Sequence, residues 1–373
     1  MKHELISGKE FNKALFELKE IRIIEFTDEV ALKGVELTDL SNDRDGSVAG
    51  WKEDDVYKVS TQNEGQKVIF NEDCKKMFAD FLHLKEIEFC MIDTTHVTDM
   101  SEMFDECEEL EKLDLSGFDT SNVTNMSEMF AVCESLENLN LSSFKTSNVT
   151  NMNAMFFDCS FLKQLDVSSF DTSKVKNMNH MFSECIGLIS LDLSNFDTSR
   201  VENMGNMFYF YQGLKLDLSG FDTSKVKYMN GMFAWCENLK ELDLSSFDTL
   251  NVKDMSDMFW QCIRLESLNL SSFNTSNVTD MSAMFYDCSK LTSLNLSNFN
   301  TSKVVDMNKM FYKCTNLSSL DLSGFNTSNV SNMINMLDNC SRLRTIKVRS
   351  QTDIDKLKAN NTKVNSSVKF IIA

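Results

Sequence analysis

The chain has 373 residues, of which 42% are hydrophobic, and it contains no proline. Its 37 Lys and Arg residues against 56 Asp and Glu residues give a net charge of −19, which disfavours nucleic acids and anionic membrane surfaces as partners, since both need a basic surface. No stretch of about 18 apolar residues is present, so no transmembrane helix is predicted.

Residues 1–72 follow no repeat and are predicted to form a small N-terminal α/β cap. The apolar side chains of residues 10–19 recur at helical spacing, and shorter apolar segments indicate strands. The first 20 residues include no uninterrupted apolar segment of the kind found in secretory signals, so no secretory signal is predicted there. The expected strands are residues 21–26, 48–51, 56–59 and 67–70, with the second and third joined as a hairpin.

Residues 73–349 repeat a single unit about eleven times. Every copy except the last contains a Met-Phe pair, and Met336-Leu337 takes its place in the last copy. Successive copies are 26 residues apart, except for one step of 25. A unit of this length cannot bury its own apolar face, so the period predicts a solenoid in which the coils stack in register. The pairs begin at Met77, Met103, Met129, Met155, Met181, Met207, Met232, Met258, Met284 and Met310.

One copy illustrates the expected coil. Leu113 and Leu115 alternate with polar residues, which predicts a strand with one buried face. The Asp-Thr-Ser segment after Phe118 is typical of a turn. Val123 and Met126 then return to the core, in an extended piece or a second short strand.

The end of the coil carries apolar residues at a different spacing. Met129, Phe130 and Cys133 follow one another within three or four residues, which favours a short helix or a 3₁₀ turn. The predicted fold class is therefore an α/β repeat, a leucine-rich-repeat solenoid with a short strand and a short helix or 3₁₀ turn in each coil.

Eleven cysteines are present, and nine of them occupy one position of the repeat. No C-x-x-C pair occurs, which disfavours zinc sites and thioredoxin-like chemistry. Free cysteine packs as a small hydrophobe, so a buried ladder of reduced thiols is predicted, with disulfides between neighbouring coils as the alternative. The nine are Cys107, Cys133, Cys159, Cys185, Cys236, Cys262, Cys288, Cys314 and Cys340.

One copy departs from the pattern, and the chain ends outside it. Tyr211 replaces the cysteine in the copy with the 25-residue step, and a local irregularity or a bend is expected at residues 213–216. Residues 350–373 are predicted to form a C-terminal cap. After a last strand at residues 343–348, a helix is expected at residues 353–359 and a closing strand at residues 368–372.

Two rows of polar side chains accompany the buried rows. The first lies between the leucines of each strand and projects into solvent, where carboxylates at strand spacing repel one another unless water, partial protonation, cations or a basic partner offset the repulsion. A partner-binding face and a merely solvated face both fit this pattern. The candidate binding residues are Asp166, Asp192, Asp217 and Asp243. The second row is interpreted as turn-forming, and it contains Asp93, Asp119, Asp171, Asp197, Asp222 and Asp248.

A third row follows the Met-Phe pair and is aromatic in several copies. Tyr and Trp are enriched at protein interfaces, so this row is the strongest candidate for a partner-binding surface, with core filling as the alternative. Its members are Phe157, Tyr209, Trp260, Tyr286 and Tyr312, with Trp235 one residue further along its copy.

No catalytic, cofactor or metal site is predicted, and the protein is not expected to be an enzyme. The four histidines form no recognisable set with Ser, Cys or acidic partners, and no glycine-rich phosphate loop occurs. The segment at residues 41–46 is similar to a calcium loop, but Ser41 and Lys52 stand where carboxylate ligands are needed, so a turn is expected there.

The unit LDLSGFDTSNVTNMSEMFAVCESLENLNLSSF closely resembles the BspA-like leucine-rich-repeat proteins of bacteria and mycoplasmas, in the variant with F-D-T-S-x-V and M-x-x-M-F-x-x-C. The resemblance covers about residues 72–349, and the segment DRDGSVAGWKEDDVYKVSTQ is similar to one that often precedes these repeats. It implies a secreted or cell-surface protein with adhesion or matrix-protein binding as its activity, and no catalytic residues.

These observations predict a non-enzymatic protein-binding repeat scaffold that acts in surface recognition or adhesion. We expect a monomer without cofactors, whose partner is a protein such as a host extracellular or basic protein. The alternative is an intracellular structural or regulatory repeat protein with no adhesive role, because no secretory signal is predicted. Cell-surface or secreted localisation follows from the resemblance, and cytoplasmic localisation from the alternative.

Overall fold

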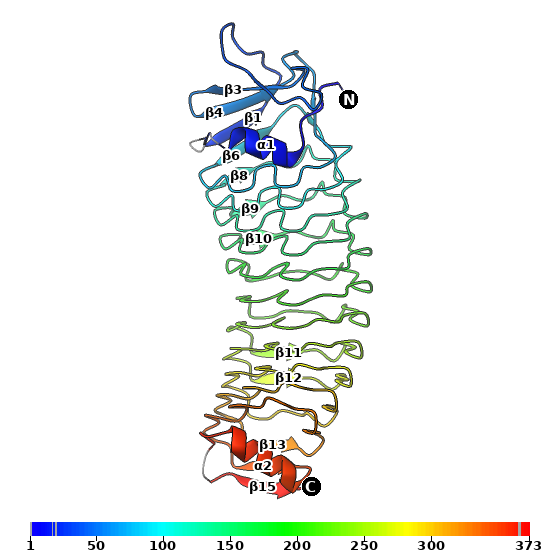
Figure 1. The fold of residues 1–373 in the computed structure, drawn as a ribbon, viewed down its shortest axis with the longest axis vertical. Helices are drawn as coiled ribbons and strands as arrows, with labels where there is room; N and C mark the ends of the chain where they lie inside the picture. Colours follow the sequence, from blue (N-terminus) through cyan, green and yellow to red (C-terminus); the bar gives the residue numbers. More distant parts are fainter. Residues whose placement is uncertain (1, 17, 19–20, 365–366) are drawn as a thin grey trace. The chain divides into compact units, whose positions relative to one another are not determined.

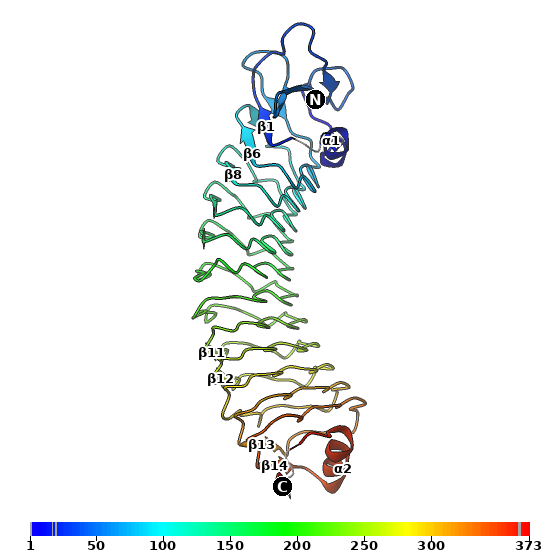
Figure 2. The same ribbon diagram turned by 90° about the vertical axis from the view of Figure 1, so that its left-hand side faces the viewer.

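The computed structural model describes residues 2–16, 18, 21–364 and 367–373. The chain forms two compact units. The first unit contains residues 1–175 and 184–195, and the second unit contains residues 176–183 and 196–373. Within each unit, successive coils of the chain lie one above the next (Figures 1 and 2).

The first unit begins with one helix and a six-stranded sheet. The sheet has the order β2-β3-β4-β1-β6-β8, in which β3 and β4 form the expected hairpin and β4, β1, β6 and β8 are parallel. β5 and β7 form a separate short parallel pair. The elements are α1 (Gly8–Leu15), β1 (Ile23–Phe26), β2 (Thr38–Asp39), β3 (Ala49–Glu53), β4 (Val56–Ser60), β5 (Val68–Ile69), β6 (Glu86–Phe89), β7 (Ile92–Asp93) and β8 (Lys112–Leu113).

The helix α1 starts two residues earlier than expected and ends at Leu15, whereas residues 17 and 19 of the predicted helix lie outside the described residues. Its first residue, Gly8, packs on the first coil of the stack. A Cβ atom at this position would lie 2.5 Å from the carbonyl carbon of Cys74, so only glycine allows the helix to begin there. Phe11 and Leu15 are fully buried and attach the helix to the core.

Strands of neighbouring coils pair in parallel, residue by residue, at a separation of 26 positions. Glu86 pairs with Lys112 and Asn138 with Gln164 in the first unit, and Glu241 pairs with Ser267 in the second. The predicted register of the stack is therefore present within each unit. The remaining strands are β9 (Asn138–Leu139), β10 (Gln164–Leu165), β11 (Glu241–Asp243), β12 (Ser267–Asn269), β13 (Ser319–Leu322), β14 (Thr345–Val348) and β15 (Lys369–Ile372).

The interior of each unit is built from rows of identical side chains. In the first unit the rings of Phe78 and Phe104 are stacked with centroids 5.4 Å apart. The second unit has a row of its own, with centroids 5.9 Å apart from Phe208 to Phe233 and 5.8 Å apart from Phe233 to Phe259. The valine and methionine rows beside them are buried as well. Each coil thus shares its core with its neighbours, as the repeat length predicts.

The segment with the M-x-x-M-F-x-x-C spacing is not helical, which corrects the expected helix or 3₁₀ turn. It forms consecutive β-turns of type II, because the third residue of each turn has a positive φ. Glu128 and Val132 both have φ of +56°, and the Cys133 amide donates to the Phe130 carbonyl at 3.3 Å. In the part of the chain that the structure describes, α1 and α2 are the only helices, and neither is long and apolar enough to cross a bilayer.

These turns leave alternate amides free to bond between coils. The amides of Glu128, Phe130 and Val132 donate to carbonyl oxygens of the following coil at 2.8, 3.0 and 2.7 Å. A helix would satisfy the same amides within its own coil. Turns are therefore favoured because they join the coils as a sheet does, while the apolar residues still recur every three or four positions.

The copy with the 25-residue step is locally irregular, as expected. The Tyr211 ring fills the cysteine position and its hydroxyl donates to the Lys215 carbonyl at 3.2 Å. A Cβ atom at Gly213 would lie 2.2 Å from that hydroxyl, so glycine is required beneath the ring. Leu214, at a position where other copies bury a leucine, is 65% exposed, and no strand forms at residues 213–216.

The second unit ends with the helix α2 (Gln351–Asn360) and the strand β15. The Ser350 side chain accepts a hydrogen bond from the Asp353 amide, which caps the helix, and the Thr327 hydroxyl donates to the Asp353 carboxylate at 2.6 Å. The helix is longer than the predicted residues 353–359 because this cap lies before them. The strands β13, β14 and β15 form one parallel sheet.

Candidate protein-binding surfaces

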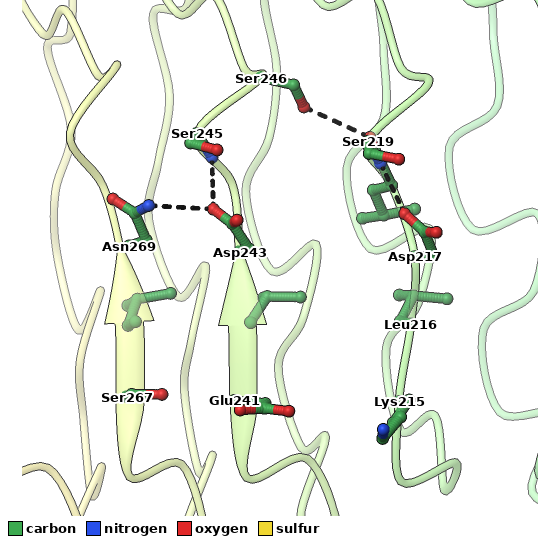
Figure 3. A pocket seen from close by; sticks show the side chains of 13 residues that line it. Lys215, Leu216, Asp217, Ser219, Glu241, Asp243, Ser245, Ser246, Ser267 and Asn269 are labelled. Carbon is green, nitrogen blue, oxygen red and sulfur yellow. Dashed lines mark hydrogen bonds between the residues drawn. The ribbon is translucent and has the colours of Figure 1, made fainter.

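The strand row of aspartates forms one turn in each coil. The Asp217 carboxylate accepts a hydrogen bond from the Ser219 amide at 3.0 Å, and Asp243 accepts one from the Ser245 amide at 3.0 Å (Figure 3). The same bond joins Asp166 to Ser168 in the first unit. The row therefore ends the strands with Asx turns, a structural role that sequence reasoning assigned only to the second row.

Hydrogen bonds favour the ionised form of the aspartates in this row. The amide and hydroxyl of Ser219 hold the pKa of Asp217 below its usual range, and those of Ser245 do the same for the pKa of Asp243. The Asn269 side chain also donates to Asp243 at 3.1 Å. Partial protonation, one of the expected ways to offset the repulsion, is therefore disfavoured, since hydrogen-bond donors and interleaved asparagines stabilise the charges.

A hollow of about 510 Å³ opens on the strand face of the second unit, beside the irregular copy. Its floor includes Leu216, and its rim carries charged side chains, among them Lys215, Asp217, Glu241 and Asp243 (Figure 3). This face presents both charge signs and has no convergent donor set of the kind found in a catalytic centre. It can accept polar groups of a partner, which leaves the strand row as a candidate contact surface.

The second row of aspartates forms the predicted turns, but the neighbouring threonines were not recognised from the sequence. Asp222 accepts from the Ser224 amide at 2.9 Å, as an Asx turn requires. Thr223, only 1% exposed, donates its hydroxyl to the Asp248 carbonyl of the next coil at 2.9 Å. The signal was a threonine at one fixed repeat position, which a turn alone does not require.

The aromatic row forms a continuous band in the second unit. We call Tyr209, Phe210, Trp235, Trp260, Tyr286 and Tyr312 the aromatic band. The Phe210 and Trp235 rings are stacked with centroids 5.5 Å apart, and the Trp235 and Trp260 rings meet edge to face at 5.6 Å. The contacts continue from Trp260 to Tyr286 at 6.0 Å and from Tyr286 to Tyr312 at 4.9 Å.

All members of the band are half-buried, so each ring packs on its neighbours and still presents one side to solvent. Phe210 was not predicted, because it lies one position outside the row, yet it is the stacking partner that brings Trp235 into the band. The Trp235 indole N–H is buried without a hydrogen-bond partner among the described residues. Phe157 is also half-buried but belongs to the first unit, so it is not part of this band.

Acidic groups lie in the same turns as the aromatic band. Burial raises the pKa of Asp257 to about 6, with Asp280 and Asp254 adding to the rise. Burial also raises the pKa of Asp287, against the opposing effect of Lys313, whose ammonium lies 3.8 Å from the Asp287 carboxylate and 5.9 Å from the Tyr312 ring centre. An aromatic surface with acidic groups beside it suits apolar and cationic side chains of a partner.

The cysteine ladder is buried, and all eleven cysteines are free thiols, so the alternative of disulfides between coils is wrong for this structure. Each ladder thiol donates to a phenylalanine carbonyl of the preceding coil, for example Cys236 to Phe208 at 3.2 Å and Cys262 to Phe233 at 3.1 Å. Burial raises the pKa of every ladder thiol. The thiolate is the reactive form, so these groups are structural.

One cluster of carboxylates in the first unit has the spacing of metal ligands. Oxygen atoms of Glu102, Asp105 and Glu128 lie within 4.8 Å of one another. Glu102, however, forms ion pairs with Lys75 and Lys76, which balance much of the negative charge. An acidic group of this kind is common on protein surfaces, and we assign it no metal.

Comparison with known proteins places the chain in a family. A model of the family described as "Mycoplasma protein of unknown function, DUF285" matches residues 72–189, 187–268 and 261–370. No curated protein is matched. Among solved structures, the chain is similar to the functional domain of InlJ from Listeria monocytogenes, described as including a cysteine ladder, with 15% sequence identity and a TM-score of 0.27 over 74% of this chain and 67% of that one. Because the family model covers nearly the whole repeat region, the chain belongs to the DUF285 family of Mycoplasma proteins.

Proposed function

We propose that this chain is a non-enzymatic recognition scaffold of the leucine-rich-repeat type, and that its aromatic band binds a protein partner. The observation that carries the proposal is the band itself: six half-buried rings from neighbouring coils are in contact in one row. Large aromatic side chains dominate the binding energy of protein interfaces, and they lose little conformational entropy on binding.

The partner expected is a protein with basic and apolar side chains. The chain carries a net charge of −19, and Asp257 and Asp287 lie in the turns that hold the band. Opposite charge accelerates association and excludes acidic partners. The strand face, on which Asp217, Glu241 and Asp243 outnumber Lys215, offers a second contact surface for basic groups.

The aromatic-band test uses a variant with Tyr209, Trp260, Tyr286 and Tyr312 replaced by serine. The probes are an extract of extracellular-matrix proteins and a cytosolic extract, each passed over the immobilised chain, with the captured protein then purified and titrated. The loss of a single aromatic anchor costs about 2 kcal/mol, which weakens binding about 30-fold. We therefore expect the variant, which lacks four anchors, to bind the captured protein at least about 30-fold more weakly. A matched control replaces the exposed residues Leu250, Val305 and Ile334 with serine and is expected to bind normally.

The strand face is tested separately with Asp217→Asn and Asp243→Asn. Asparagine occupies the same position in other coils, as at Asn269, so the Asx turns are kept and only the charge is lost. A contribution from this face would appear as weaker binding at low salt and little change at high salt. Unchanged affinity in the folded variants of both surfaces would reject the proposal.

Adhesion at the cell surface is the finer form of this proposal and is supported by the resemblance to BspA-like proteins. It requires the chain to be accessible from outside. Treating intact source cells with protease should remove it while a cytoplasmic marker stays intact. Full protection of the chain until the cells are lysed would instead support the intracellular structural or regulatory role.

A further inference from the structure

The C-terminal end of the second unit, as far as the structure describes it, carries the edge strand β15. Leu322, Val348 and Ile372 stand side by side in the register of β13, β14 and β15, and they are 3%, 1% and 50% exposed. No described coil lies beyond β15, so a residue of the buried row faces solvent and the outer edge of the strand is unpaired. Such an end needs a cover, because exposed apolar rows and strand edges associate readily.

This end is basic, unlike the rest of the chain. Residues 341–373 contain eight Lys and Arg residues and two Asp residues, whereas the complete chain has 37 basic and 56 acidic residues. One of the two acids, Asp353, is buried in hydrogen bonds with Thr327 and Ser350. Exposed cations at this end include Arg342, Arg344, Arg349, Lys358, Lys363 and Lys369.

The N-terminal end of the first unit has the complementary properties. The segment from Asp28 to Asp45, which includes the edge strand β2, contains six acidic and two basic residues. Several of its apolar side chains are also exposed, with Val30 at 56%, Leu32 at 77% and Leu37 at 46%. Exposed apolar residues therefore lie among acidic side chains at this end, whereas those of β15 lie among basic side chains.

We propose that the basic C-terminal end of one copy docks on the acidic N-terminal end of a second copy, so that copies associate head to tail. The two ends have opposite charge, and each has exposed apolar residues beside an edge strand. The two surfaces differ, so the contact is heterologous and leads to chains or rings of copies rather than to a symmetric pair. This proposal goes beyond the monomer expected from the sequence and is independent of the aromatic band.

The test is sedimentation velocity of the full chain and of two end variants. The C-end variant carries Ile371→Asp and Ile372→Asp, and the N-end variant carries Leu32→Asp and Leu37→Asp. We expect the average mass of the wild type to rise with protein concentration, and each variant alone to stay monomeric. An equimolar mixture of the two variants should form a dimer, because each supplies the end that the other lacks. Raising the salt to about 0.5 M should weaken the association roughly tenfold.

Two controls separate docking from misfolding. Arg344→Glu with Lys369→Glu reverses the charge of two side chains and lowers the net charge of residues 341–373 from +6 to +2, while the apolar residues of β15 are kept. This variant should associate more weakly than the wild type but unfold at the same temperature. Ile334→Asp, at a residue 53% exposed on the side of the stack, should associate as the wild type does. A wild type that stays monomeric at low salt overturns the proposal. So does an N-end variant that still dimerises, since its association would join two C-terminal ends.

Discussion

Single buried hydroxyl groups join the coils within each unit. The Thr249 hydroxyl donates to the Asn274 carbonyl at 3.0 Å and accepts from the Asn274 amide at 2.7 Å, and Thr275 repeats the first bond to Asn300 at 3.0 Å. Both threonines are fully buried. One side chain thus satisfies two backbone groups of the next coil that would otherwise be buried without partners.

Asp105 is expected to make stability depend on pH. Burial raises its pKa to about 7, and Glu106, Glu128 and Glu102 add to the rise. Because this value exceeds the unfolded pKa of about 4, the folded state holds the extra proton between these values, and stability falls as the pH rises from about 4 to 7. Asp105→Asn should therefore be more stable than the wild type at about pH 8, by about 1 kcal/mol after screening by solvent, and nearly equal to it at about pH 4.

Urea denaturation at the two pH values measures this difference. Asp114→Asn is the matched control, since the Ser116 amide and hydroxyl lower the pKa of Asp114 and its ionised form is stabilised. That variant should gain nothing at high pH. An Asp105→Asn variant that is no more stable than the wild type at high pH would show that burial and the neighbouring carboxylates do not destabilise the ionised form of Asp105.

At the scale of elements, the consecutive type II turns decide how the coils are joined. Each turn places its third residue in the left-handed region, and most of these residues are not glycine. These turns are stabilised because the amides that they leave free donate hydrogen bonds to the next coil, as the amides of Phe104 and Phe130 do at 3.0 Å. The cost of the left-handed residues is offset by these bonds between coils.

Val132 is the residue for which this conformation costs most, since it is β-branched and has φ of +56°. Val132→Asn should stabilise the chain by about 0.5–1 kcal/mol, because asparagine tolerates the left-handed region, as Asn335 and Asn339 do at φ of +58° and +64°. Chemical denaturation measures the change. Val123→Asn, at a fully buried position, is the destabilising control. A loss of stability for Val132→Asn would mean that its packing outweighs the backbone strain.

At the scale of the whole molecule, the buried rows control chemical reactivity. Ten of the eleven cysteines are buried, and Cys90 alone is exposed. We expect a thiol-reactive chromogenic reagent to modify about one thiol per folded chain and all eleven in denaturant. Cys90→Ser should leave almost no reaction with the folded chain. Rapid modification of several ladder cysteines would contradict the packing of the coils.

Much of the architecture could be predicted because the apolar positions of the repeat identify the buried side chains. The valine, methionine, phenylalanine and cysteine rows are buried where the 26-residue period placed them, and the strands β11 and β12 pair in that register. The aromatic row was also visible in the sequence. Its extension through Phe210 was not, because the contact with Trp235 depends on how two neighbouring turns are aligned.

The sequence by itself determined which side chains lie inside and how far apart equivalent residues are, because both follow from a strict apolar period. Only the tertiary structure decided between helix and consecutive turns at residues such as Glu128 and Val132, since both place apolar residues three or four positions apart. The choice depends on bonds to the next coil, which no single copy contains. The same reason hid the buried role of Thr223, whose partner is a carbonyl 25 residues away.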